Sequence, residues 1–176
     1  DLSITSAGVL TFASAPDYET KSSYSATVTA SDGTNSTSQA ITVSVTDVDD
    51  VAPVFTSSAT FSAAENQTAI GTITTTDPDN DTVIYSLSGT DASSMSINSS
   101  SGLLTFNSAP DYETKSSYSA TVTASDGTNS STQDITVTIT DVDDVAPVFT
   151  SSATFSAAEN QTSIGTVTAT DTDTDD

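Results

Sequence analysis

The stretch Ser117–Thr140 has the sequence SYSATVTASDGTNSSTQDITVTIT, in which apolar residues alternate with polar ones, mostly Ser and Thr. A period of two is typical of half-buried β-strands, and the Asp-Gly pair between the two halves is a common hairpin turn. The stretch is therefore expected to form the last two strands of a domain. Their inward side chains are Tyr118, Ala120, Val122, Ala124, Ile135, Val137 and Ile139.

Earlier strands are expected in the same domain, and no segment of useful length shows a helical period. Seven short strands joined by turn-rich segments predict an all-β fold, a seven-stranded Greek-key (immunoglobulin-like) β-sandwich. The earlier strands fall at Val54–Ala63, with a break allowed in the middle, Ala69–Thr75, Thr82–Leu87, Ser94–Ile97 and Leu103–Phe106. The predicted core is Phe55, Phe61, Ile70, Ile73, Tyr85, Leu87, Ile97, Leu104, Phe106, Tyr118, Val122, Val137 and Ile139.

The chain repeats itself with a period of 94 residues. Asp47–Thr68 is identical to Asp141–Thr162, and Ser14–Ser36 is identical to Ser108–Ser130. Such a period indicates tandem domains. We expect the C-terminal part of a repeat at 1–52, a complete repeat at 53–146 and the N-terminal part of a third at 147–176, as a window onto a longer array. The alternative is a polymer of subunits that complete each other's end domains by strand exchange.

Composition favours an extracellular module over an enzyme. The 176 residues include 24 acidic and two basic side chains, giving a net charge of −22, and no His or Cys. The usual general bases, thiol nucleophiles and zinc ligands are therefore missing. Nucleic acids and anionic lipids reward Lys and Arg, so neither is an expected partner. No apolar run is long enough for membrane insertion.

The negative charge is concentrated in short motifs. In the complete repeat nine of the twelve carboxylates occur in five motifs, which are Glu65, the Asp77/Asp79 pair, the Asp111/Glu113 pair, Asp126, and Asp141, Asp143 and Asp144. Alternate residues of an extended segment point to one side, so each spaced aspartate pair can face a common ion. Carboxylate oxygens are the ligands that Ca²⁺ prefers. The pattern predicts calcium sites.

Each motif also has an ordinary interpretation. Asp126-Gly127 alone is a hairpin turn, and the segment after Asp77 is a turn capped by carboxylates. The segment after Asp111 is the start of a one-turn helix, and the acidic linker is a solvated charge run. Recurrence of all five motifs at fixed offsets favours calcium. We interpret the following as solvated surface residues: Asp81, Asp91, Asp134, Lys21 and Lys115.

The motifs, in this order, resemble those of the cadherin repeat and, in the Thr-rich version, the cadherin-like repeats of large bacterial surface adhesins. Ala-Ala-Glu-Asn at Glu65 resembles the glutamate after the first strand, and Thr-Asp-Pro-Asp resembles the paired aspartates after the second. Pro-Asp-Tyr-Glu resembles the family's Leu-Asp-Arg-Glu motif, and Ala-Ser-Asp-Gly resembles its single aspartate before the last hairpin. Asp-Val-Asp-Asp-Val-Ala-Pro-Val-Phe resembles its interdomain linker. The resemblance implies ions held between successive domains.

Carried over by motif, the resemblance implies two junctions. The first takes Asp17, Glu19, Asp47, Asp49 and Asp50 from one repeat and Asp77, Asp79 and Asp126 from the next. The second takes Glu65, Asp111, Glu113, Asp141, Asp143 and Asp144, then Asp171 and Asp173. Asp32 and Glu159 would serve junctions beyond either end.

We expect about two or three Ca²⁺ ions per junction, since each ion takes roughly 6 to 8 oxygens. The predicted function is a calcium-rigidified, secreted or surface-bound stalk in cell adhesion or a filament. Its expected partners are neighbouring repeats and like-to-like contacts. A carbohydrate-binding module is the alternative, with Tyr18 and Tyr112 as its exposed aromatic candidates; glycosidase chemistry by paired carboxylates is disfavoured.

Overall fold

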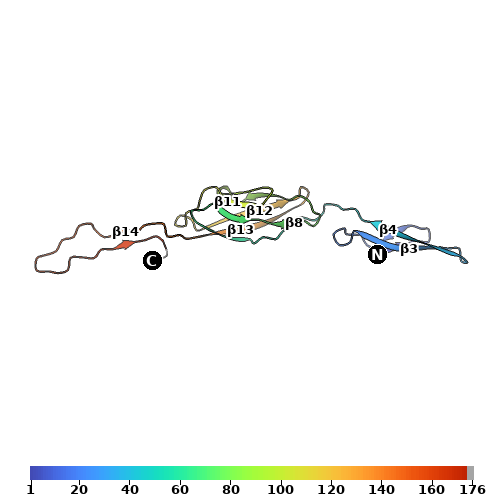
Figure 1. Ribbon diagram of the computed structural model, residues 1–176, viewed down its shortest axis with the longest axis horizontal. Helices are drawn as coiled ribbons and strands as arrows, with labels where there is room; N and C mark the ends of the chain where they lie inside the picture. Colours follow the sequence, from blue (N-terminus) through green and yellow to red (C-terminus); the bar gives the residue numbers. More distant parts are fainter. Residues whose placement is uncertain (174–176) are drawn as a thin grey trace.

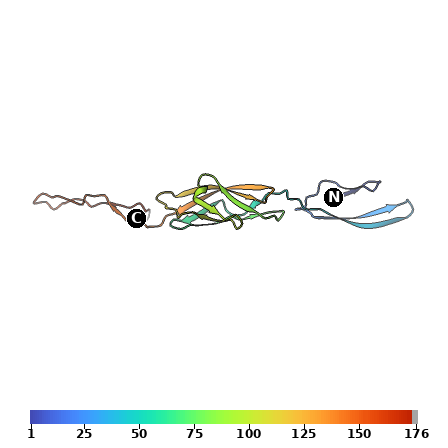
Figure 2. The ribbon, with the colours of Figure 1, turned by 90° about the horizontal axis from the view of Figure 1, so that it is seen from above.

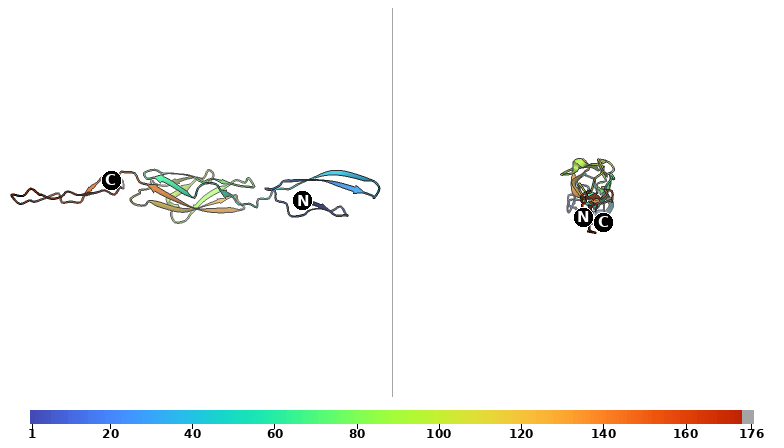
Figure 3. Two further views of the ribbon diagram at one scale, coloured as in Figure 1. Left: turned by 90° about the horizontal axis from the view of Figure 1, so that it is seen from below. Right: turned by 90° about the vertical axis from the view of Figure 1, so that its left-hand side faces the viewer.

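The structure is a computed structural model that describes residues 1–173. A central sandwich, residues 54–140, lies between an N-terminal segment, residues 1–52, and a C-terminal segment, residues 147–173 (Figures 1 and 2). The three parts follow one another along the long axis. Viewed along that axis they fall within one compact outline (Figure 3). The chain is therefore a rod.

Two sheets form the central sandwich. The first has the order β6 (Thr60–Ala64), β13 (Ser130–Thr140), β12 (Ser117–Ser125) and β9 (Ile84–Ser88). The second has the order β10 (Met95–Ile97), β11 (Leu103–Phe106) and β7 (Ala69–Thr72). A short pair, β5 (Val54–Phe55) with β8 (Thr75–Thr76), and one 3-10 turn, η1 (Ala92–Ser94), complete it. The all-β sandwich predicted from sequence is confirmed.

The register explains why the Ser/Thr alternation is so regular. β12 pairs with β13 in antiparallel fashion from Ser117↔Thr138 to Ser125↔Ser130, whereas β6 runs parallel to β13. Side chains at alternate positions therefore share a face. Val122, Val137 and their neighbours point inward, and the hydroxyl-bearing residues between them point to solvent.

The core lies between the two sheets. Every residue of the predicted inward set is buried there or packs against it. The structure adds Ala63 and Met95, which the prediction left out. The buried apolar residues are Ala63, Ile73, Tyr85, Met95, Leu104, Phe106, Ala120, Val122, Ala124, Ile135, Val137 and Ile139. Tyr112, proposed above as an exposed aromatic, instead packs against this core.

The two flanking segments repeat parts of this pattern. The N-terminal segment holds β1 (Leu2–Ile4), β2 (Leu10–Phe12), β3 (Ser23–Ser31) and β4 (Ser36–Ser44). The pairing of β3 with β4 copies that of β12 with β13, with Tyr24↔Val43 standing where Tyr118↔Val137 stands. The C-terminal segment holds the short pair β14 (Val148–Phe149) and β15 (Ala169–Thr170).

One glycine has a strict steric role. Gly102 precedes β11 with φ of +70°, and a Cβ atom there would lie 2.2 Å from the carbonyl oxygen of Ile73. A residue with a side chain cannot occupy this close approach without a backbone shift. Gly8, 94 residues earlier, has φ of +81° but nothing within 4 Å of the same position.

Asp91 differs from its prediction. Its side chain is only 12% exposed; one oxygen accepts a hydrogen bond from Lys115, and the other accepts the Ser119 N–H at 2.8 Å. Lys115 also lies 4.6 Å from the ring centroid of Tyr118. These contacts lower the pKa of Asp91, chiefly through Lys115. The solvated-surface prediction is therefore wrong for Asp91, because η1 places it beside β12.

Candidate metal centres at the repeat junctions

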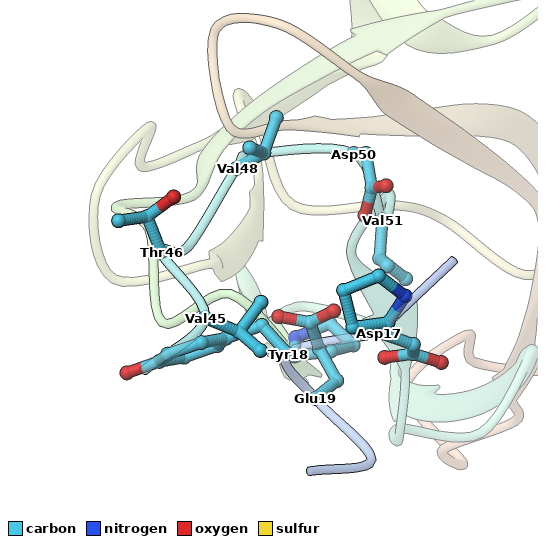
Figure 4. A pocket seen from close by; sticks show the side chains of 10 residues that line it. Asp17, Tyr18, Glu19, Val45, Thr46, Val48, Asp50 and Val51 are labelled. Atoms are coloured by element: carbon cyan, nitrogen blue, oxygen red, sulfur yellow. The ribbon is translucent and has the colours of Figure 1, made fainter. Parts of the chain in front are cut away.

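Carboxylates converge at the first junction, the region where linker residues 46–53 join the N-terminal segment to the central sandwich. Glu19, Asp50 and Asp79 each offer an oxygen, and the three atoms lie within 4.8 Å of one another. Glu19 and Asp50 line one pocket of about 490 Å³ together with Asp17 and Tyr18 (Figure 4). Residues from both repeats and the linker therefore meet at one point.

The second junction, around linker residues 140–147, has the same character. Glu65, Glu113 and Asp144 form one group of oxygens within 4.8 Å, and Glu113, Asp141 and Asp173 form another. Asp173 comes from the C-terminal segment and the others from the central sandwich or the linker. The two groups share Glu113, so its carboxylate links them.

Aspartates of the following repeat hold each linker by its backbone. Asp79 Oδ2 accepts the N–H groups of Asp50 at 3.1 Å and Val51 at 2.9 Å. Asp173 Oδ2 accepts those of Asp144 at 2.9 Å and Val145 at 2.7 Å. Both aspartates are 8% exposed, and the Oδ1 atom of each is buried without a hydrogen-bond partner among the described residues.

Asp77 and Asp126 divide their oxygens in the same way. Asp77 Oδ1 accepts the Asp79 N–H at 3.0 Å, and Asp126 Oδ1 accepts those of Thr128 and Asn129 at 2.8 and 2.6 Å. The Oδ2 atoms of both aspartates are buried without a partner in the described part of the chain. The turn-capping interpretation of these motifs therefore holds for one oxygen and leaves the other available.

These unpartnered oxygens test whether a metal would fit. A carboxylate only accepts hydrogen bonds, and a buried charge without a partner is costly. Four such oxygens at two junctions, in a chain with two lysines engaged elsewhere, fit a hard cation with oxygen ligands.

Glu65 joins three segments at the base of the central sandwich. It directly follows β6 and is 2% exposed. Its Oε2 accepts the Tyr112 N–H and its Oε1 the Val142 N–H, both at 2.8 Å. Its own N–H donates to the Thr140 carbonyl at 3.1 Å. Glu65 thus holds the start of the linker to the sandwich as well as standing in a candidate metal group.

Crowded negative charge alters the acidity of two glutamates. A backbone hydrogen bond at Glu19 acts to lower its pKa, but loss of hydration and the carboxylates of Asp79 and Asp47 outweigh it and raise the pKa to about 7. Glu113 has the same opposing backbone contact, and loss of hydration together with Glu65, Asp141 and Asp173 raises its pKa. Both glutamates therefore hold protons more tightly than usual when no cation is bound.

Other predicted ligands lie outside these oxygen groups. Asp17 and Asp111 each use both oxygens on the threonine three residues later, Thr20 or Thr114. They act as turn caps, and the Thr20 contacts lower the pKa of Asp17.

The remaining predicted ligands also lie outside the three oxygen groups. Asp171 Oδ1 accepts the Asp173 N–H at 3.3 Å, and the charge of Asp47 acts on Glu19. Asp143 belongs to none of the three groups. Glu159 is exposed, and Asp32 caps its own hairpin.

The sequence interpretation missed two asparagines. Asn129 Nδ2 donates to Asp49 Oδ1 at 2.8 Å, and Asn66 Nδ2 donates to Asp144. Asn66 adopts φ of +60°, a left-handed conformation that asparagine tolerates better than most residues. A signal was present for both, because each asparagine follows a carboxylate motif and recurs 94 residues away, at Asn35 and Asn160.

Comparison with known proteins identifies the family of the central sandwich. Residues 59–140 match the Cadherin domain family. Residues 59–140 are a cadherin domain. Among solved structures, Protocadherin Gamma B2 extracellular cadherin domains 3-6 superimposes with a TM-score of 0.83 at 28% identity, covering 98% of this chain and 48% of that one. A cis-dimer structure of Protocadherin gammaB7 EC3-6 gives 0.81 at 31% identity, covering 94% and 46%.

The cadherin relationship extends over most of the chain. The Drosophila melanogaster protocadherin-like wing polarity protein stan is 34% identical in an alignment of 161 positions that covers 82% of this chain and 4% of that protein. Protocadherin Fat 4 of Mus musculus is 35% identical in an alignment of 184 positions, gaps included, that covers 94% of this chain and 4% of that protein. The chain thus spans a small part of these relatives. They are animal cadherins and not enzymes, so the narrower resemblance to bacterial adhesins gains no support from them.

One further observation concerns membranes. Among residues 1–173, no helix is long and apolar enough to cross a bilayer.

Proposed function

We propose that this chain is part of an extracellular stalk of successive cadherin-like repeats, at 1–52, 53–146 and 147–176, which Ca²⁺ ions stiffen at each junction. The observation that carries the proposal is the shared division of labour in Asp77, Asp79, Asp126 and Asp173. One oxygen of each accepts backbone N–H groups, from the linker for Asp79 and Asp173 and from its own turn for Asp77 and Asp126. The other oxygen is buried at a junction without a partner among the described residues.

The proposed ligands are the predicted sets. The first junction would use Asp17, Glu19, Asp47, Asp49, Asp50, Asp77, Asp79 and Asp126. The second would use Glu65, Asp111, Glu113, Asp141, Asp143, Asp144, Asp171 and Asp173. The grouped oxygens of Glu19, Asp50 and Asp79 and of the two second-junction groups support the sets most directly. About two or three ions per junction would satisfy this many carboxylates.

Calcium would stiffen the rod because its ligands come from both sides of each linker. When bound, the cation neutralises carboxylates that otherwise repel one another. An ion that binds only the assembled junction stabilises that arrangement by mass action. Without the ion, the backbone contacts of Asp79 and Glu65 still hold each linker end, so bending is expected at the linker and not within the sandwich.

The proposed setting is the cell surface or secreted matrix. Relatives named as protocadherins support an adhesive role, and the cis-dimer structure of Protocadherin gammaB7 EC3-6 supports like-to-like contacts as a proposed partner mode. No enzymatic role is proposed.

Small-angle X-ray scattering tests the proposal directly. The 176-residue chain should show a longer maximum dimension and a larger radius of gyration in about 2 mM CaCl₂ than in chelator, with Mg²⁺ at the same concentration as the control. A scattering profile that does not respond to calcium at any concentration up to about 10 mM would refute the stiffening role.

A further inference from the structure

The hairpin that joins β12 to β13 reaches the linker of the first junction. Asn129 Nδ2 lies 2.8 Å from Asp49 Oδ1 and 3.4 Å from the Asp49 carbonyl oxygen. The two residues are 80 positions apart in sequence. The contact is therefore a tertiary one. It joins the β12–β13 hairpin of the cadherin domain to the linker that precedes this domain.

The hairpin holds the backbone of Asn129 on both sides of its Cα atom. Asp126 Oδ1 accepts the Asn129 N–H at 2.6 Å, and the Asn129 carbonyl accepts the Ser125 hydroxyl at 3.0 Å. Asn129 is therefore held on both sides of its Cα atom and is only partly exposed. Only the side-chain torsions of Asn129 remain to be ordered when its amide meets Asp49.

Asp49 lies in an acidic region, so the hydrogen bond donated by the Asn129 amide matters for its position. Asp126 accepts the backbone N–H of Asn129 and Asp49 accepts its side-chain amide, so two carboxylates of this junction meet at one asparagine. Both lysines of the chain are paired elsewhere, with Asp1 and Asp91. A neutral amide therefore supplies a hydrogen-bond donor to this acidic group where no cationic side chain does.

We propose that Asn129 is a positioning residue of the first junction. By occupying Oδ1 of Asp49 it fixes that carboxylate against the following repeat and leaves Oδ2 for a cation. The inference rests on the proposed calcium function, and it adds a determinant that is not itself a carboxylate ligand.

The chain carries its own control. Asn35 lies in an identical Asp-Gly-Thr-Asn hairpin, where Asp32 Oδ1 accepts the Thr34 and Asn35 N–H groups at 2.9 and 2.7 Å. Its side chain helps to lower the pKa of Asp32 in the same hairpin, and among the described residues it makes no hydrogen bond to a linker. A change of Asn35 therefore removes the same chemical group with the same local backbone contacts.

Calcium titration followed by ¹⁵N–¹H NMR on the full chain can resolve the junctions. The amides of Asp50 and Val51 report on the first junction, and those of Asp144 and Val145 on the second. We expect Asn129→Ala to raise the calcium midpoint at the first junction by about tenfold, the size of one hydrogen bond to a charged group. The second junction should keep its midpoint within about twofold, and Asn35→Ala should leave both unchanged.

A double-mutant cycle separates positioning from general stability. In an Asp49→Asn background, Asn129→Ala should change the midpoint by less than about twofold, and the melting temperature in chelator should fall no more for Asn129→Ala than for Asn35→Ala. Equal midpoints for Asn129→Ala and Asn35→Ala, or an undiminished effect in the Asp49→Asn background, would overturn the inference. Failure of the unaltered chain to respond to calcium at either junction would instead overturn the proposed function.

Discussion

Replacing Glu65 with alanine tests whether this carboxylate stabilises the cadherin domain even without a cation. The side chain is 2% exposed, and its oxygens accept the N–H groups of Tyr112 and Val142. Its loss leaves two part-buried backbone donors without their acceptor, at about 1 to 3 kcal/mol each. We expect the free energy of unfolding to fall by on the order of 3 kcal/mol in chelator, because the small cavity allows only partial rehydration.

The assay is thermal unfolding followed by circular dichroism, in EDTA and in calcium. A loss of about 3 kcal/mol corresponds to a midpoint lower by roughly 12 to 24 °C for a domain of this size. Glu65→Gln keeps one acceptor oxygen, so its midpoint should fall between those of the unaltered chain and Glu65→Ala.

Glu159 provides the matched control. It lies in a segment identical in sequence to that of Glu65, Ala153–Thr162 against Ala59–Thr68, but it is exposed. We expect Glu159→Ala to change stability by no more than about 0.5 kcal/mol, as for other surface substitutions. If the two alanine variants lower the midpoint in EDTA by the same amount, the backbone role assigned to Glu65 is wrong.

Three further predictions concern strain, acidity and a partly exposed ion pair. Gly102→Ala should cost at least about 2 kcal/mol by chemical denaturation, since it combines a positive φ with a clash, whereas Gly8→Ala should cost less; equal costs would contradict the steric argument. The raised pKa of Glu19 stabilises the metal-free first junction below about pH 4.5, and that contribution is lost as the pH rises through about 7. Calcium must displace this proton, so its affinity at the first junction, measured by calorimetry, should weaken from pH 8 to pH 6. Glu19→Gln should make the calcium affinity of the first junction less dependent on pH. An equally steep pH dependence in that variant would contradict the role assigned to the Glu19 proton. Asp91→Ala leaves Lys115 without its partner and should lower the melting temperature at any calcium level; an unchanged melting temperature would show the pair to be dispensable.

The sequence alone determined the sandwich and its core. Alternation of Ile, Val and Tyr with Ser and Thr is sufficient to define strands and their inward faces, because β-strand geometry forces alternate residues onto opposite sides. The 94-residue period likewise fixed which motifs correspond. Acidic motifs at linker and turn positions were also visible, since charge spacing is a local property of the chain.

Only the tertiary structure decided how each carboxylate divides its two oxygens. Asp17 and Asp111 turn both toward a nearby threonine, whereas Asp79 gives one to a linker that lies 28 residues earlier in the chain. Asn129 and Asp91 gained their partners in the same manner, through segments distant in sequence that meet only when the sandwich closes. Such contacts depend on the relative placement of distant segments, which local residue pattern does not encode.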